Sequence, residues 1–301
     1  MGARVAYAAA VQFGLKSVLE GTTFRALQEL WQYADEIDLY QSAWVNDHLL
    51  PVLGDRTDPC LESWVTVTAL AQATTRLRVG FLVSAMIYRH PAVLAKMAAT
   101  LDIVSDGRLD LGLGAGWAAD ECATYGIDLP PLGERFDRFE EGCDVVTRLL
   151  TGEVSSFQGQ FFRLVDAPCA PKPLQRPHPP IMIGGTGPKR TLRAVARFAD
   201  HWNCPISPAT VEESIDEWRR LRDVLADRCA EIGRDPATIT TSIQLGYNSE
   251  PNEVADRAAM WREVGVDVGI LSFDPPCDPD NLAATAAALT ALTPDSGTRW
   301  Q

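Results

Sequence analysis

The sequence predicts an α/β fold, a single (β/α)8 TIM barrel that spans residues 1–301. Strand-like and helix-like segments alternate along the chain, and this alternation indicates parallel strands. Eight such pairs fit within 301 residues, 46% of which are hydrophobic, enough to bury one large core. An open, doubly wound sheet is the alternative that the same alternation allows.

The predicted strands are short apolar runs, as is typical of parallel strands buried on both faces. They cover residues 4–11, 40–45, 77–84, 109–113, 181–183, 201–206, 240–245 and 268–273. The predicted helices carry apolar residues at spacings of three and four, so each has one buried face. They cover residues 24–36, 61–74, 93–101, 134–150, 189–198, 211–225, 254–264 and 282–292. His90 and Pro91 mark the start of the third helix.

One stretch, residues 155–180, interrupts the alternation. It is rich in Pro and Gly, and it places Phe157, Phe161 and Phe162 around Gly159. Such a pattern is typical of a hairpin and loop. We therefore expect an insertion before the fifth strand and no second domain.

Composition limits the partners. The chain has 27 Lys and Arg against 40 Asp and Glu, a net charge of −13, which argues against binding nucleic acid or an anionic membrane. No apolar run approaches the ~20 residues of a membrane span, so we expect a cytoplasmic protein. The seven cysteines include no CxxC pair and are interpreted as reduced thiols. We expect a small-molecule substrate and no metal site, and a homodimer is possible.

Two glycine-rich segments follow predicted strands, GLGAGW at residues 112–117 and IGGTGPKR at residues 183–190. Backbone without side chains lets a bulky anionic cofactor approach amide N–H groups. The first segment has GxGxG spacing and lacks the dinucleotide pattern GxGxxG, and the second is not a Walker A loop. Close backbone packing at a strand end explains the first segment equally well.

The second segment is interpreted as a phosphate cradle, because glycines, a hydroxyl and two cations meet at a helix start. Its residues are Gly185, Thr186, Gly187, Lys189 and Arg190. Arg193 and Arg197 continue the cations along one helical side, with no acid before Asp200. A solvated basic face is the alternative, but in so acidic a chain the arrangement favours an anion site.

Three further strand ends carry candidates. Asp47 and His48 follow the second strand, where the histidine can transfer a proton at neutral pH. A loop-capping Asp beside an incidental His is the alternative. Ser84 ends the third strand and can donate to a ring carbonyl. Trp44 and Trp117 are candidates for a substrate pocket, and a place in the core is the alternative for each.

Four segments together resemble a known family: WVNDHL, RHPAVLAKMAATLDIVSDGRLDLGLGAGW, ERFDRFEEG and RPHPPIMIGGTGPKRTLRAVARFADHWN. They resemble the bacterial luciferase-like superfamily, and within it the actinobacterial oxidoreductases that use the deazaflavin coenzyme F420. The resemblance covers residues 34–203 and becomes weaker after residue 208. The fold that it implies is the barrel predicted above.

The resemblance implies coenzyme F420 as cofactor, with FMN as the alternative. Asp47 would contact the ring, and His48 would be the proton donor beside it. Ser84 would meet the ring near a non-prolyl cis peptide. The resemblance further implies that the ribityl chain of the cofactor would be lined by Ala115, Gly116 and Asp120. The phosphate would be held by Thr186, Gly187, Lys189 and Arg190.

The implied activity is hydride transfer between carbon 5 of the deazaflavin and a small organic substrate. An FMNH2-dependent two-component monooxygenase and a non-catalytic flavin-binding barrel are the alternatives. Trp117 stands where sugar-phosphate dehydrogenases of the family carry a catalytic Glu, and residues 205–208 lack a cation found in several members. The first departure argues against sugar-phosphate oxidation, and the second leaves the binding of the cofactor tail to Lys189 and Arg190.

Overall fold

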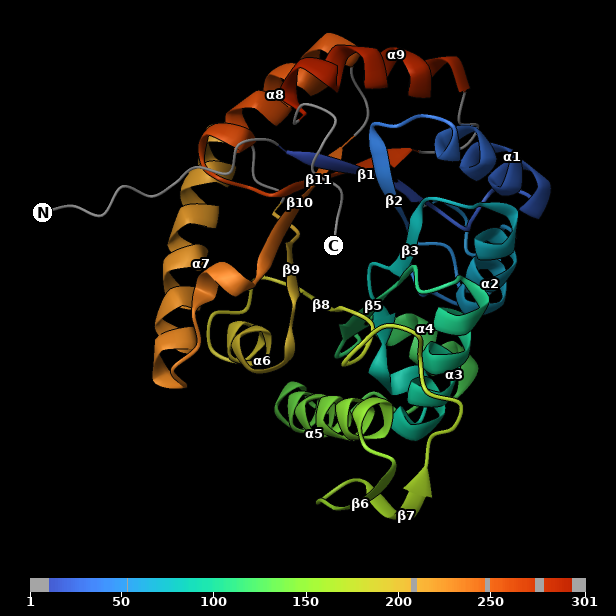
Figure 1. The fold of residues 1–301 in the computed structure, drawn as a ribbon, viewed down its shortest axis with the longest axis vertical. Helices are drawn as coiled ribbons and strands as arrows, with labels where there is room; N and C mark the ends of the chain where they lie inside the picture. Colours follow the sequence, from blue (N-terminus) through green and yellow to red (C-terminus); the bar gives the residue numbers. More distant parts are fainter. Residues whose placement is uncertain (1–10, 53, 207–209, 247–249, 274–278, 294–301) are drawn as a thin grey trace, which may run out of the picture.

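The computed structural model describes residues 11–52, 54–206, 210–246, 250–273 and 279–293. Nine parallel strands form one closed sheet, in which β4 continues β3, so that eight positions surround the axis (Figure 1). Closure comes from the pairing of β3 with β5 and of β11 with β1. The strands are β1 (Gln12–Ser17), β2 (Tyr40–Val45), β3 (Arg78–Phe81), β4 (Ser84–Ala85), β5 (Leu109–Gly114), β8 (Ile181–Gly184), β9 (His201–Cys204), β10 (Thr240–Gly246) and β11 (Val268–Phe273). The barrel prediction is confirmed, and the open sheet is wrong.

Helices form the outer layer of the barrel (Figure 1). They are α1 (Phe24–Asp35), α2 (Ser63–Ala73), α3 (Pro91–Val104), α4 (Ala119–Tyr125), α5 (Leu132–Thr151), α6 (Thr191–Phe198), α7 (Val211–Glu231), α8 (Pro251–Glu263) and α9 (Pro279–Leu289). The helix-start prediction is confirmed, because the His90 side chain accepts a hydrogen bond from the Ala92 N–H and Pro91 begins α3. Helix α4 was not predicted, since its seven residues are too few to show a period.

The predicted first strand is misplaced. Residues 4–10 lie outside the described part of the chain, and the first described strand is β1, Gln12–Ser17. The prediction ended the strand at Val11 because the apolar run is broken at Gln12. A barrel strand, however, can direct polar side chains into the mouth of the barrel, and Lys16 does so by lining a cavity there.

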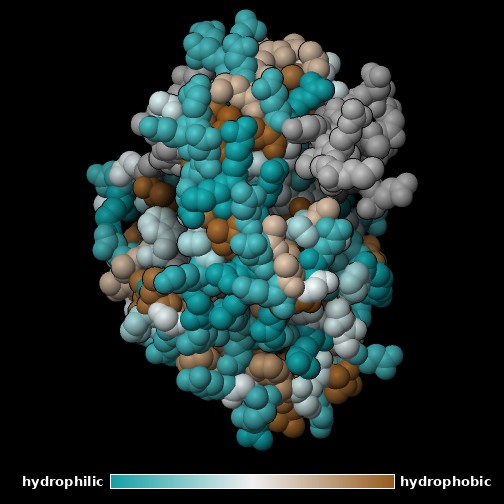
Figure 2. Space-filling view, turned by 90° about the vertical axis from the view of Figure 1, so that its left-hand side faces the viewer, coloured by the Kyte–Doolittle hydropathy of each residue, from teal (hydrophilic) through white to brown (hydrophobic). Residues whose placement is uncertain are grey.

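The insertion contains an antiparallel hairpin of β6 (Val154–Gln158) and β7 (Arg163–Pro168), beyond α5 in Figure 1. The surface on the α7 side is mainly hydrophilic, with apolar residues in small separate patches (Figure 2). Within the described ranges, no helix has the length and apolar character needed to cross a membrane.

Candidate functional site

A cavity of about 350 Å³ opens where the strands end, the face on which barrel active sites lie. Polar side chains come from β1, β9, β10 and the segment after β2, namely Lys16, Asn203, Gln244, Asn46, Asp47 and His48. Backbone and apolar atoms come from the strand ends on the other side, at Leu82, Val83, Gly114, Gly116, Gly184 and Gly185. We call this space the ring cavity.

A backbone bulge between β3 and β4 forms one wall of the ring cavity. The peptide bond between Leu82 and Val83 is cis, as the family resemblance led us to expect. A Cβ atom on Gly112 would lie 1.7 Å from the carbonyl oxygen of Phe81, and one on Gly114 would lie 2.6 Å from Cγ2 of Val83. These two glycines therefore make room for the bulge, which is the packing interpretation of the first glycine segment.

Asp47 is a buried anchor at the base of the ring cavity. Its carboxylate accepts hydrogen bonds from Ser63 and Ser84 at 2.6 Å, from the Ala85 N–H at 3.2 Å and from Arg89 at 2.6 and 3.2 Å. The side chain is 1% exposed. Asp47 thus fixes the bulge and the following segment, and its oxygens are already occupied by protein donors.

Ser84 does not line the ring cavity or either of two neighbouring cavities. Its hydroxyl donates to Asp47 and accepts from the indole N–H of Trp64 at 3.1 Å, and the residue is fully buried. A role for this hydroxyl at a ring carbonyl therefore has no support in its position.

His48 lies at the cavity wall and is held by Glu121 of α4. The Nδ1 atom of His48 is 2.9 Å from Oε2 of Glu121, which also accepts from the Tyr88 hydroxyl. The other carboxylate oxygen accepts from the N–H groups of Leu49 and of Leu50, the latter at 2.7 Å. Because a carboxylate only accepts, Nδ1 carries the proton and Nε2 is left for a ligand.

Electrostatics keep Glu121 ionised. Burial raises the pKa of its carboxyl, but the hydrogen bonds from Tyr88, His48 and the two backbone N–H groups together lower that pKa below its ordinary value. The pKa of Tyr88 is raised far above its ordinary value, mainly by burial and then by the bond to Glu121, so Tyr88 stays a donor. Sequence reasoning missed both residues because Tyr88 and Glu121 are 33 positions apart.

The two tryptophans predicted for a substrate pocket lie in different places. Trp117 is 65% exposed, lines the ring cavity and meets the His48 ring edge to face, with centroids 5.4 Å apart. Trp44 instead packs in the barrel interior with Leu82, Met182 and other apolar side chains, and it does not line the ring cavity. Its buried position gives its predicted place in the pocket no support.

The basic stripe of α6 is neutralised by acids of α5. Arg190 contacts Asp137 at 2.5 Å and Glu140 at 3.1 Å, while Arg193 contacts Glu140 at 2.7 Å. Arg197 likewise contacts Asp144 at 2.7 Å. The sequence showed no acid nearby because the partners precede these arginines by 50 or 53 positions. The cations of the stripe are thus largely a helix–helix contact, which corrects the interpretation of Arg190 as an available cation.

The rest of the predicted cradle remains exposed at the cavity edge. Gly185 lines the ring cavity with φ of 132°, a conformation that favours glycine. Thr186 and Gly187 follow in the loop before α6 and are partly exposed. Lys189 is exposed and forms no ion pair with any described residue.

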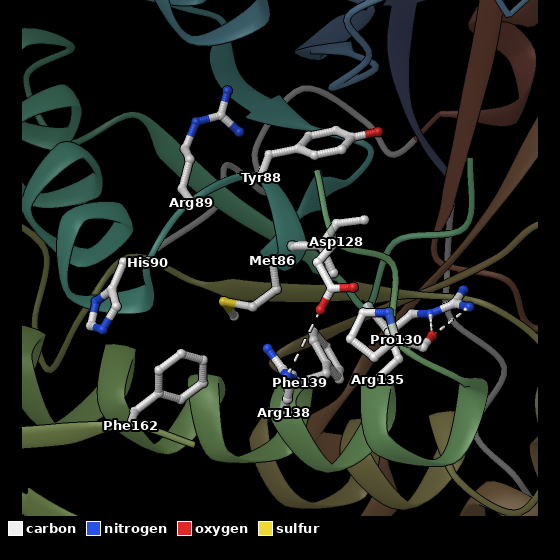
Figure 3. A pocket seen from close by; sticks show the side chains of 12 residues that line it. Met86, Tyr88, Arg89, His90, Asp128, Pro130, Arg135, Arg138, Phe139 and Phe162 are labelled. Atoms are coloured by element: carbon white, nitrogen blue, oxygen red, sulfur yellow. Dashed lines mark hydrogen bonds and ion pairs between the residues drawn. The ribbon is translucent and has the colours of Figure 1, made fainter. Parts of the chain in front are cut away.

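A second cavity, of about 300 Å³, lies between the segment after β4 and α5 (Figure 3). It shares Tyr88 with the ring cavity and is lined by Ala115, which the sequence assigned to the ribityl chain. Its Arg135 donates to the carbonyl oxygens of Gly116 and Pro130 at 3.0 and 3.1 Å. Carbonyl partners leave Arg135 as a cation without a carboxylate partner among the described residues, in a cavity that Asp128 also lines, and sequence reasoning missed it.

Asp120, the third residue assigned to the ribityl chain, lies elsewhere. Its side chain is 89% exposed and 3.4 Å from Arg56. It lines a third cavity, of about 480 Å³, which shares His48, Val52 and Trp117 with the ring cavity. Asp120 is thus separated from Ala115 and does not line the ring cavity.

The inner end of the ring cavity is a chain of polar side chains. Lys16 donates to Gln244 at 3.0 Å, Gln244 donates to Asn203 at 3.3 Å and Asn203 donates to Ser242 at 2.9 Å. The sequence analysis did not single out any of these residues. Closure of the barrel brings them to one place, because they lie on β1, β9 and β10.

The fold and this site define a barrel enzyme with a cofactor-sized cavity at its carboxyl-terminal face. The chain belongs to the luciferase-like monooxygenase family, which it matches over residues 4–293.

Several relatives are similar to this chain. It is 34% identical over 264 residues to an F420-dependent glucose-6-phosphate dehydrogenase of Amycolatopsis mediterranei, covering 83% of this chain and 74% of the relative. It is 33% identical over 233 residues to an F420-dependent hydroxymycolic acid dehydrogenase of Mycobacterium tuberculosis, covering 74% and 59%. A solved F420-dependent secondary alcohol dehydrogenase superposes with a TM-score of 0.79 at 21% identity, covering 95% of this chain and 100% of that one.

Proposed function

We propose that this protein is an F420-dependent oxidoreductase that exchanges a hydride and a proton with a small organic substrate. The observation that carries the proposal is the oriented His48, whose Nδ1 is fixed by Glu121 at the edge of a cavity that glycines of two strand ends also line. The F420-dependent relatives at 33 and 34% identity support the choice of cofactor.

The ring cavity fits a flat, polar-edged ring. One part of its wall is the Leu82–Val83 bulge with Gly184 and Gly185, where the glycines add no side chain. At its inner end, the amide groups of Asn203 and Gln244 offer both donors and acceptors, which ring carbonyls and a ring N–H require.

An anionic chain attached to the ring finds cations on two sides. Lys189 in the loop before α6 and Arg135 beside the second cavity have no carboxylate partner among the described residues. We assign the phosphate to Thr186, Gly187, Lys189 and Arg135. Arg190 supports the loop through α5 and does not face the phosphate with a free charge.

When bound, the deazaflavin supplies a carbon that accepts or donates a hydride. His48 moves the accompanying proton at Nε2, while Glu121 keeps its ring oriented through Nδ1. Tyr88 and the N–H groups of Leu49 and Leu50 hold Glu121 in turn. Asp47 positions the segment that carries His48, and Trp117 packs against the His48 ring.

A fluorescence titration of the purified protein with oxidised F420, run in parallel with FMN, tests the proposal. We expect micromolar binding of F420, weakened about tenfold by Lys189→Gln because one charged contact is lost. Preference for FMN, or coupling of oxygen consumption to FMNH2, would contradict the deazaflavin assignment. Turnover that is unchanged in His48→Ala would contradict the role of His48.

A further inference from the structure

The third cavity adjoins His48, and its lining indicates what kind of substrate it accepts. It lies between the segment after β2 and the start of α4, and we call it the outer chamber. Six apolar residues form most of its wall, namely Leu50, Pro51, Val52, Trp117, Ala118 and Ala119. His48, Val52 and Trp117 also line the ring cavity, so a molecule in the outer chamber adjoins both His48 and the ring cavity.

The charged groups of the outer chamber disfavour an anion. Arg56 is the one Lys or Arg among its described lining residues, and it is already engaged by Asp120 at 3.4 Å and by the Thr124 hydroxyl at 2.7 Å. Asp120 and Glu121 are both acidic. A phosphate or carboxylate placed here would meet two carboxylates and one cation that has a partner.

The loop after β8 at this end of the barrel carries the cation Lys189, which does not line the outer chamber, whereas the sequence that follows three other strands carries no cation. The sequence after β9, β10 and β11, at residues 205–214, 247–256 and 274–281, contains several Asp and Glu and no Lys or Arg. Large apolar side chains are instead presented to solvent around the chamber, with Trp117 65% and Val52 40% exposed. Exposed apolar groups at the rim of a cavity are typical of a binding site for an apolar ligand.

We infer that the substrate is an uncharged alcohol, or the corresponding ketone, with an apolar body that fills the outer chamber; the inference rests on the proposed function. In the oxidative direction, the carbinol carbon gives up a hydride to the oxidised deazaflavin and the hydroxyl gives up its proton to Nε2 of His48. The C–O single bond becomes a double bond, so two electrons and two hydrogens leave the alcohol. The two carboxylates of the chamber disfavour a phosphorylated sugar in this place.

Cyclohexanol and 4-hydroxycyclohexanecarboxylate are matched probes, because they share the carbinol and differ by one carboxylate. Calorimetric titration of the protein, in which no turnover is needed, should show cyclohexanol binding at least about tenfold more tightly than the carboxylate. In Val52→Arg this preference should fall about fivefold or more, since the new cation lies in the wall of the chamber. Val165→Arg is the control, because Val165 is 66% exposed on β7 of the hairpin and lines no described cavity.

Two outcomes overturn the inference: equal or tighter binding of the carboxylate, or a preference unchanged by Val52→Arg. Absence of binding of both probes overturns it as well. The F420 titration separates it from the proposed function. If the protein prefers cyclohexanol but does not bind F420, the substrate assignment of the outer chamber stands and the proposed function is contradicted. If it binds F420 but does not prefer cyclohexanol, the proposed function stands and the substrate assignment is contradicted.

Discussion

Glu121→Gln tests the pair that orients His48. The Glu121 carboxylate serves four donors, and glutamine keeps its shape while offering one acceptor oxygen and one NH2 donor. The N–H groups of Leu49 and Leu50 require the oxygen, so the new NH2 must face His48. Because NH2 can only donate, we expect the His48 proton to move from Nδ1 to Nε2, which removes the acceptor that the reaction needs.

The cost in stability follows from the same bonds. A hydrogen bond to a charged group contributes ~1.5–3 kcal/mol and a neutral one ~0.5–1.5 kcal/mol, so neutralising the acceptor costs roughly 1 kcal/mol a bond. Relief of carboxylate burial, which opposes ionisation of Glu121, offsets part of the loss. We expect the free energy of unfolding to fall by roughly 2–3 kcal/mol.

Nitrogen-15 NMR reports the tautomer directly, since the chain has only four histidines and His48→Gln identifies the relevant signal. Urea unfolding measures the stability. Glu141→Gln is the matched control, because Glu141 accepts from the N–H groups of Gln160 at 3.0 Å, Phe161 at 2.9 Å and Phe162 at 2.6 Å in the hairpin. A His48 tautomer that is unchanged in Glu121→Gln, or changed equally in Glu141→Gln, would refute the reasoning.

Three further results are expected. Gly112→Ala should lower the free energy of unfolding by more than about 3 kcal/mol or prevent folding, because the new Cβ would meet the Phe81 carbonyl oxygen. Gly133→Ala in α5 is the control, because its Cβ would have no atom within 4 Å. In urea unfolding we expect it to stabilise the protein by up to ~1 kcal/mol. Burial, with a smaller contribution from the charge of Arg78, lowers the pKa of His201 from 6.5 to about 3. Between pH 6.5 and 3, the unfolded chain therefore binds a proton at His201 that the folded protein does not bind, so the free energy of unfolding falls as the pH drops through this range. His201→Leu should reduce this pH dependence, which unfolding curves measured at several pH values in the same range would show. Arg190→Gln should lower the free energy of unfolding by up to ~1 kcal/mol, because its ion pairs are partly exposed. We expect it to change the affinity for F420 by no more than about twofold, unlike Lys189→Gln. Equal loss of F420 binding in the two variants would show that Arg190 belongs to the phosphate site.

Local pattern was sufficient for most of the barrel. The strand predicted at residues 40–45 coincides with β2, and the His90–Pro91 start of α3 is confirmed by its capping bond. These features depend on alternation, spacing and caps, which neighbouring residues determine. The first strand was misplaced because a polar side chain that faces a barrel mouth looks, in sequence, like the end of a strand.

The sequence by itself determined the barrel, the family and the positions of His48 and Lys189 at strand or helix ends. Only the tertiary structure decided how each was used. Closure of the sheet places Glu121 within hydrogen-bond distance of His48. Packing of α5 on α6 pairs Arg190 with Glu140, and the bulge beside β5 occupies the space where a side chain at Gly112 would lie. Each of these depends on partners far apart along the chain, and the free energy of a charge or a glycine is set by what lies next to it in space.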